Sequence, residues 1–190
     1  MPFPERVETD RLILRRWRPG DLDAYLAIWA DPDVREHLSP GREPEPEELA
    51  RRFRHQLDHW RRHGFGLWHA IDRATGEPAG WIGAWYPDFI PELVGEIEIG
   101  WTLRSPFWGR GLATEGARVA VKTAATHLDP PRLISIISPA NERSIAVSSR
   151  LGMERATTVR HPELDVALDV YELSNPSSSR GASPQSTSSR

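Results

Sequence analysis

Hydrophobic side chains recur along this chain at two spacings, and each spacing predicts one kind of regular element. Alternation at every second position predicts strands. They cover residues 11–17, 67–71, 79–85, 93–103, 133–138, 154–159 and 166–173. Repeats at three and four positions predict helices. They cover residues 22–30, 49–63, 113–127 and 142–151.

Residues that favour helix ends support these boundaries. Asp21 and Asn141 precede predicted helices, where a side-chain oxygen can accept a hydrogen bond from a free backbone N–H. Gly64 and Gly152 follow helices, where glycine adopts the left-handed conformation easily. The proline-rich stretch 42–48 predicts a loop before the second helix. This order of elements predicts a mixed α/β (α+β) fold with helices on both faces of one sheet.

The composition changes at the end of the chain. Residues 174–190 are largely Ser, Pro, Gly, Gln, Asn and Arg, with no apolar side chain besides Ala182. Such a segment cannot bury enough surface to offset the entropy lost on ordering. We therefore expect one folded domain over residues 1–173 and a disordered, serine-rich tail over residues 174–190.

Composition and charge exclude several classes of function. The chain has 190 residues and no cysteine, which excludes disulfides, thiolate metal sites and a cysteine nucleophile. Its 24 basic and 27 acidic side chains give a net charge of −3, which argues against direct nucleic-acid binding. No apolar run approaches the length of a membrane span, and the first residues lack a signal-peptide pattern. We expect a cytoplasmic protein with no membrane partner.

The strongest chemical signal lies where a predicted strand runs into a predicted helix. The turn between them contains Gly109 and Gly111, and the small residue Ala113 follows. Glycines let backbone N–H groups approach a ligand closely, and a helix N-terminus favours negative charge. The pattern predicts a phosphate or pyrophosphate site with Arg110 at its rim. The alternative is a tight turn with no ligand.

Two well-known nucleotide motifs do not fit this turn. A Walker A loop needs Gly-Lys followed by Ser or Thr, and the turn has no lysine. A dinucleotide fingerprint needs a third glycine where Thr114 stands, inside a parallel βαβ unit. The strands before the turn have an antiparallel pattern instead, so both nucleotide motifs are excluded.

Residues 99–115, IGWTLRSPFWGRGLATE, resemble the acetyl-CoA signature of the GNAT superfamily of N-acetyltransferases, in particular its RimJ/RimL-type branch. Trp108 stands where the general pattern has Arg or Gln, as is usual in this branch, and Gly111 and Ala113 match the other positions. Further segments resemble the branch in the same order. They are ETDRLILR at residues 8–15, DPDV at residues 31–34 and the segment 141–153. The resemblance covers residues 7–173.

The resemblance implies a GNAT-like fold, with a single, mostly antiparallel mixed sheet of about seven strands flanked by about four helices. The sheet is splayed between its fourth and fifth strands. The resemblance also implies acetyl-CoA as co-substrate, with no metal, and places the pantetheine arm in the splay. Backbone groups of Trp101, Thr102 and Leu103 would bind that arm. The other implied acetyl-CoA-binding residues are Trp108, Gly109, Arg110, Gly111, Leu112, Ala113, Thr114, Asn141 and Ser144.

Amine acetylation needs a base, because only a neutral amine attacks a thioester. Glu96 and Glu98 alternate with isoleucines, so the pattern predicts both carboxylates on one face of the strand. Glu98 is the first candidate for the base and Glu96 the second. The alternative is that both only bind water or arginine. A backbone N–H near residues 101–103 is the candidate donor to the oxyanion.

The general acid is less clearly marked. Many members of the superfamily have a tyrosine seven residues after the late-helix asparagine, and here that position is Ser148. Ser144 is the better-placed hydroxyl by resemblance. The alternatives are that Ser144 binds only the co-substrate, or that it supports the Asn141 cap.

The predicted second helix carries a different pattern. His55, His59 and His63 recur every four residues among several arginines, without the glutamate of zinc-binding helices. This pattern favours a solvated basic face over a metal site, and such a face could also contact an acidic acceptor. Trp85 and Tyr86 are candidates for a wall of the acceptor site.

We expect an enzyme that moves acetyl from acetyl-CoA to a primary amine by direct attack in a ternary complex. The resemblance favours a protein N-terminal α-amine, as in ribosomal-protein acetylases. The alternatives are a small-molecule amine, such as an antibiotic or polyamine, and a non-catalytic CoA-binding or scaffold protein that has kept the fold. Dimers are common in this branch, so the resemblance also allows a homodimer. The sequence does not identify the acceptor.

Overall fold

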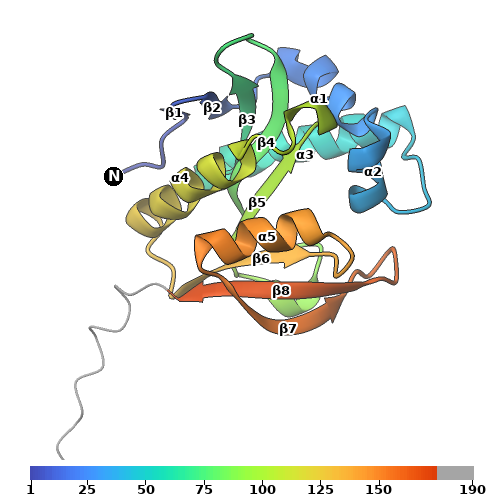
Figure 1. Ribbon diagram of the computed structural model, residues 1–190, viewed down its shortest axis with the longest axis vertical. Helices are drawn as coiled ribbons and strands as arrows, with labels where there is room; N and C mark the ends of the chain where they lie inside the picture. Colours follow the sequence, from blue (N-terminus) through green and yellow to red (C-terminus); the bar gives the residue numbers. More distant parts are fainter. Residues whose placement is uncertain (175–190) are drawn as a thin grey trace, which may run out of the picture.

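The computed structural model describes residues 1–174, which form an eight-stranded sheet with helices packed on it (Figure 1). The strands are β1 (Arg6–Glu8), β2 (Leu12–Arg16), β3 (Leu67–Asp72), β4 (Pro78–Trp85), β5 (Glu98–Leu103), β6 (Arg132–Ile137), β7 (Glu154–Arg160) and β8 (Ala167–Ser174). The α-helices are α1 (Leu22–Trp29), α2 (Pro32–Leu38), α3 (Pro46–His63), α4 (Leu112–His127) and α5 (Glu142–Leu151). Short 3₁₀ turns are η1 (Pro19–Asp21), η2 (Pro91–Leu93) and η3 (Ser105–Phe107).

The strands lie in the order β1-β2-β3-β4-β5-β6-β8-β7. Neighbouring strands are antiparallel except β5 and β6, which run parallel. Parallel neighbours need a long connection from one end of the sheet to the other, and α4 supplies it. The predicted fold class, a mixed and mostly antiparallel sheet, is therefore confirmed.

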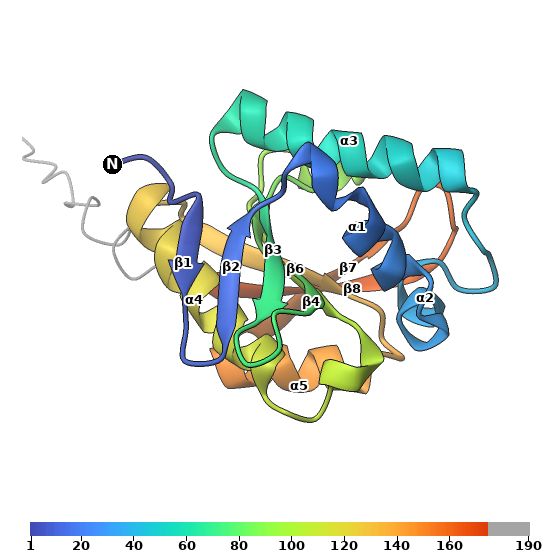
Figure 2. The ribbon, with the colours of Figure 1, turned by 90° about the horizontal axis from the view of Figure 1, so that it is seen from above.

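Helices cover both faces of the sheet. Figure 2 shows α1, α2 and α3 on one side and α4 and α5 on the other. On the first side, a buried cluster that includes Trp17, Trp81 and Phe53 joins the sheet to α1 and α3. On the second side, a cluster that includes Ile82 and Ala117 joins the sheet to α4. Both sides of the central strands are thus buried, which explains why these strands are apolar almost throughout.

The structure adds one helix to those predicted. The pair Asp31-Pro32 was expected only to end the first helix, yet Pro32 begins α2. Proline fits the first turn of a helix because that turn needs no N–H donor, and the Asp31 side chain accepts a hydrogen bond from the N–H of Asp33 at 3.2 Å. The same residues can therefore end one helix and start the next.

Several strand boundaries also differ from the prediction. β1 was not predicted, because it has three residues and a mostly exposed pattern. β5 begins at Glu98 rather than at residue 93, since Leu93 belongs to the turn η2. Ser174 ends β8, and the rest of the predicted tail, residues 175–190, lies outside the described residues.

The sheet requires glycine at Gly83 in β4. A Cβ built there would lie 2.7 Å from the backbone oxygen of Gly66 and 2.8 Å from the Cα of Leu67. We expect Gly83→Ala to lower the free energy of unfolding by about 1–3 kcal/mol, because backbone atoms cannot move aside as side chains do. Urea unfolding measures this, with Gly20→Ala as control, since a Cβ there meets nothing within 4 Å. Equal stability of the two variants would contradict the close packing.

Candidate active site

The strands β5 and β6 separate soon after they meet. Their register is confined to Glu98 opposite Ile134, where the N–H of Ile134 also donates to the carbonyl of Ile97 at 2.9 Å. Beyond that point β5 keeps its pairing with β4, and β6 keeps its pairing with β8. The predicted splay is therefore present, between β5 and β6.

The backbone groups of β5 alternate between its two neighbours. The N–H of Arg104 donates to the carbonyl of Ala79 at 2.8 Å, so even-numbered residues of β5, Thr102 among them, turn their backbone groups toward β4. Those of Trp101 and Leu103 therefore point to the side where β6 has moved away. This corrects one prediction, because the backbone of Thr102 does not face the splay.

Trp108 connects the turn after β5 to its surroundings. Its indole N–H donates to the carbonyl of Leu103 at 2.6 Å, and the guanidinium of Arg143, from α5, lies 4.6 Å from the centre of its ring. The carbonyl of Leu103 therefore already accepts a hydrogen bond from the Trp108 side chain. The N–H of Leu103 and both backbone groups of Trp101 still point into the splay.

The turn before α4 has the backbone geometry expected of an anion site. Gly109 and Gly111 have positive φ angles of 71° and 76°, and Gly111 precedes the helix. The N-cap residue Gly111 has no side chain that could accept a hydrogen bond from α4, so the first N–H groups of the helix are left for another acceptor. A pyrophosphate is such an acceptor, and the turn therefore fits one.

Arg110 does not lie free at the rim of this turn. Its guanidinium pairs with the carboxylate of Asp72, at the end of β3, at 2.8 Å. Its carbonyl accepts a hydrogen bond from Arg11 at 2.6 Å. The side chain of Arg110 therefore braces the turn against the β2–β3 end of the sheet.

A second brace was not predicted and involves Glu115, in the first turn of α4. Its carboxylate accepts from the guanidinium of Arg11 at 2.7 Å and from the hydroxyl of Thr9 at 2.5 Å. Thr9, Arg11 and Glu115 all stand in the segments that carry the resemblance. The sequence signal for this contact was that all three residues occur in the segments similar to the RimJ/RimL-type branch. The hydrogen bonds among them give a physical reason for that shared occurrence.

The residues predicted on α5 lie at its first turn. The side-chain oxygen of Asn141 accepts from the N–H of Ser144 at 3.0 Å, which confirms that Asn141 caps the helix. Ser144 is half-buried, so its hydroxyl is within reach of solvent. Ser148 is fully buried and donates to the carbonyl of Ile145 at 2.8 Å. Its hydroxyl therefore does not replace the absent tyrosine.

Glu98 is buried at the point where β5 and β6 separate. Its carboxylate accepts a hydrogen bond from the indole N–H of Trp85 at 2.8 Å. Burial raises the pKa of the Glu98 carboxyl to about 7, against the opposing effects of Trp85 and of the backbone of Ile136. A carboxyl with such a pKa can exchange a proton near neutral pH.

Glu96 does not share this position. It precedes β5, and its carboxylate pairs with Arg132 at 2.6 Å. Arg132 also pairs with Glu172 of β8 at 2.8 Å. The prediction that both carboxylates lie on one strand is therefore wrong, and the reason is that the chain reaches Glu96 before the strand begins.

His59 also differs from the prediction of a solvated face. Its side chain is buried, its Nε2 accepts from the N–H of Tyr86 at 3.0 Å, and its Nδ1 lies 2.9 Å from the carbonyl of Phe65. Since Nε2 accepts, Nδ1 must carry the proton and donate it. Burial lowers the pKa of His59 to about 4, consistent with this neutral ring. The ring holds α3 against the chain that follows Trp85. In residues 1–174 no His, Asp and Glu side chains gather as a metal site would require.

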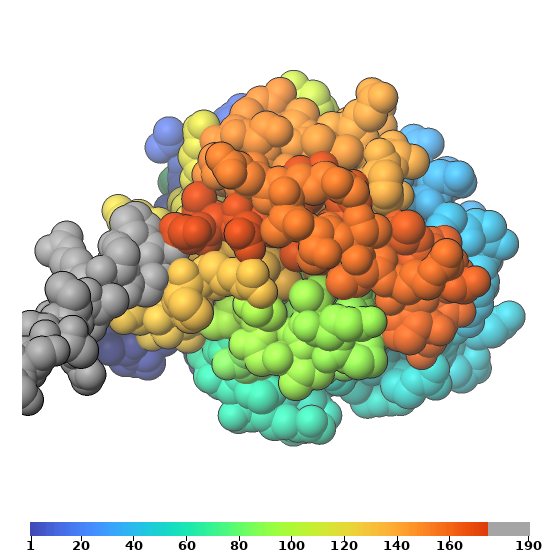
Figure 3. Space-filling view, turned by 90° about the horizontal axis from the view of Figure 1, so that it is seen from below, coloured from blue at the N-terminus to red at the C-terminus, as the bar shows by residue number. Residues whose placement is uncertain are grey.

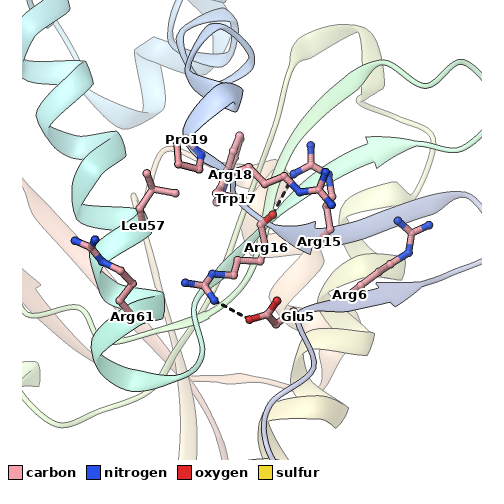
Figure 4. Close-up of a pocket in the computed structure, with 9 residues that line it drawn as sticks. All are labelled: Glu5, Arg6, Arg15, Arg16, Trp17, Arg18, Pro19, Leu57 and Arg61. Carbon is pink, nitrogen blue, oxygen red and sulfur yellow. Dashed lines mark hydrogen bonds and ion pairs between the residues drawn. The ribbon is translucent and has the colours of Figure 1, made fainter.

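The basic face of α3 borders a cavity that is separate from the residues described above. Arg61 and Leu57 line it together with the end of β2 and the N-terminal segment (Figure 4). Its volume is about 400 Å³, and none of the predicted site residues lines it. Within it Arg16 is paired with Glu5 at 2.7 Å.

The ionisation of Glu98 links stability to pH. Because folding raises the pKa of Glu98 from 4.5 to about 7, the folded protein holds a proton that the unfolded chain loses. This contribution is present at low pH and is lost as the pH rises through about 7. We expect the stability of the native protein, relative to Glu98→Gln, to fall by on the order of 2–3 kcal/mol between about pH 5 and 8.

Unfolding by urea at several pH values measures this difference. Glu92→Gln, which removes one carboxylate at an exposed residue of η2, is the control. A constant difference between the native protein and Glu98→Gln would show that Glu98 does not change its protonation in this range.

Comparison with known proteins agrees with this geometry. The family model described as "Acetyltransferase (GNAT) domain" matches residues 11–154. A Bacillus licheniformis protein named "Uncharacterized N-acetyltransferase p20" is 26% identical over 173 residues, covering 90% of this chain and 95% of its own. In the described residues, no helix has the length and apolar character of a membrane span.

Solved structures show the same fold. The acetyltransferase from Agrobacterium tumefaciens is 30% identical, with a TM-score of 0.75, and the match covers 88% of this chain and 93% of that one. A RimL ribosomal L7/L12 α-N-protein acetyltransferase, in complex with coenzyme A, has a TM-score of 0.69 at 16% identity, over 92% of this chain and 98% of that one. Since the family model spans most of the chain, this protein belongs to the GNAT family and is an acetyl-CoA-dependent N-acetyltransferase.

Proposed function

We propose that this enzyme acetylates a protein N-terminal α-amine, with Glu98 as the general base. The observation that carries the proposal is the position of Glu98, a buried carboxyl whose pKa burial raises to about 7, where β5 and β6 separate. The acceptor class is supported by the resemblance to the RimJ/RimL-type branch and by the shared fold with RimL.

The residues around the splay have distinct roles in this proposal. The N–H groups at the turn and at the start of α4, residues 109–114, bind the pyrophosphate of acetyl-CoA. The backbone groups of Trp101 and Leu103 that point into the splay bind the pantetheine arm as a neighbouring strand would. Asn141 and Ser144 contact the other side of the arm.

Acetyl transfer then needs one proton removed and one charge stabilised. Glu98 accepts the proton of the amine, through a water because the carboxyl is buried. The amine nitrogen bonds to the thioester carbon, and an N–H of Trp101 or Leu103 stabilises the negative charge that develops on the oxygen. The C–S bond breaks, and the hydroxyl of Ser144 or a water supplies a proton to the thiolate.

Acetyl-CoA should stabilise the protein against heat. A ligand at about 100 times its Kd adds about 2.7 kcal/mol to the free energy of unfolding, which amounts to several degrees for a domain of this size. Gly111→Ala should reduce this shift, because φ at Gly111 is 76° and a side chain there is strained. Gly20→Ala is the matched control. No shift with millimolar acetyl-CoA would exclude a co-substrate site at this turn.

Removal of the Glu98 carboxylate should slow the reaction without affecting co-substrate binding. We expect Glu98→Gln to lower kcat/KM by about 10²–10⁴-fold, which is the usual contribution of a general base. In the native enzyme kcat/KM should rise with pH through about 7 as Glu98 ionises, and Glu98→Gln should lack this rise. The thermal shift with acetyl-CoA should be unchanged. Native rates in Glu98→Gln would sink the assignment and leave Glu98 as a buried structural carboxyl.

Glu96→Gln provides the matched comparison, because it makes the same chemical change two residues away. Its carboxylate pairs with Arg132 outside the splay, so we expect near-native kcat/KM. A larger loss in Glu96→Gln than in Glu98→Gln would reverse the two roles. Coenzyme A release, followed with a thiol reagent, measures both variants without interference from a chain that has no cysteine.

A further inference from the structure

Phe89, in the segment between β4 and β5, is an exposed aromatic ring on a firmly held backbone. It is 38% exposed, and among the described residues the only other exposed large hydrophobic side chains are Met1 and Val94. The next residue, Ile90, is fully buried in a cluster with Ile134 and Val170. The buried Ile90 thus anchors the backbone that carries Phe89, and the Phe89 ring is exposed on an ordered segment.

The ring of Phe89 lies between two other rings. Its centre is 5.8 Å from that of Trp85 and 5.3 Å from that of His161, both within the usual range for aromatic pairs. His161 belongs to the β7–β8 hairpin. Figure 3 shows the segment between β4 and β5, in green, beside this hairpin, in orange-red. Segments far apart in sequence thus build one row of rings, Trp85–Phe89–His161, which we call the aromatic row.

His161 contributes an uncharged ring to the aromatic row. Its Nδ1 accepts hydrogen bonds from the N–H groups of Glu163 and Leu164, at 3.2 and 3.3 Å, so this nitrogen carries no proton. Burial lowers the pKa of His161, which acts in the same direction. The row therefore presents flat, neutral surfaces.

The inner end of the aromatic row is joined to the proposed base. The indole of Trp85 donates to the Glu98 carboxylate at 2.8 Å. A ring bound against Phe89 would lie one indole away from the carboxylate that accepts the amine proton.

Charges of both signs lie near the row, where the exposed Asp88 directly precedes Phe89. One acid, Glu163, and one base, Arg52, are close enough to influence His161. Arg52 is itself paired with Glu48 at 2.7 Å. An aromatic group of the acceptor needs an aromatic surface to pack on, and the row supplies one.

We propose that the aromatic row binds an aromatic ring of the acceptor, placed next to the amine that is acetylated. On a protein N-terminus this ring is the side chain of the first or second residue. The inference rests on the proposed function, since it assigns a substrate class to the same site.

Matched acceptors test the proposal. Pentapeptides that begin with Phe or with Ser and are otherwise identical form one pair, and phenethylamine and ethanolamine form another. We expect kcat/KM to be about tenfold higher for the aromatic member of a pair. Phe89→Ala should abolish this preference. Val94→Ala, a truncation at a 69% exposed residue outside the row, should keep it.

Equal rates within each pair, or a preference that survives Phe89→Ala, would overturn the proposal. Failure of the proposed function looks different, because the protein would then bind acetyl-CoA, as seen in the thermal shift, and acetylate neither peptide. Saturation-transfer NMR with the Phe-led peptide decides that case. Transfer to the ring protons with native protein but not with Phe89→Ala would support the aromatic row, and no transfer with native protein would exclude it.

Discussion

Two parallel strands that pair at a single position and then separate leave backbone groups without a strand partner. In this enzyme that position is Glu98 opposite Ile134, and the groups left over belong to Trp101 and Leu103. A β-strand edge inside a fold is normally covered, because unpaired N–H and C=O groups are costly when buried. The pantetheine arm, with amide groups of its own, is suited to cover it. In the proposed binding mode, the division of the sheet therefore supplies the backbone groups that bind acetyl-CoA.

The same point places a carboxyl in surroundings that do not favour its charge. Glu98 is the first residue of β5, and 8% of its surface is exposed to water. The indole of Trp85 donates a hydrogen bond to the carboxylate, which lowers the pKa of Glu98 less than burial raises it. Trp85 in turn precedes Tyr86, whose N–H is fixed by the neutral ring of His59. The proposed base is therefore held from β4 and α3 as well as from its own strand.

The sequence was sufficient for the fold class, because strong alternation marks the central strands and Gly64, Asn141 and Gly152 mark helix ends. It was insufficient where one pattern serves two structures. Asp31-Pro32 ends a helix and begins another, and apolar Ile97 is buried whether or not it lies in a strand. Pairings between distant residues, such as Arg110 with Asp72 or His59 with Tyr86, depend on tertiary structure. No local spacing encodes them, so the ion pair of Arg110 was not predicted and His59 was wrongly placed on a solvated face.

The two braces on the glycine turn affect the entropy that the chain would lose when an anion binds there. Arg110 ties the turn to Asp72, and Glu115 ties the start of α4 to Thr9 and Arg11. Both ties are contacts within the protein itself, and they hold the left-handed glycines in place. Binding to such a preorganised turn needs little further loss of chain entropy, because folding has already restricted it. In the proposed binding mode, the β2–β3 end of the sheet, which bears none of the proposed catalytic groups, thereby contributes to affinity for the co-substrate.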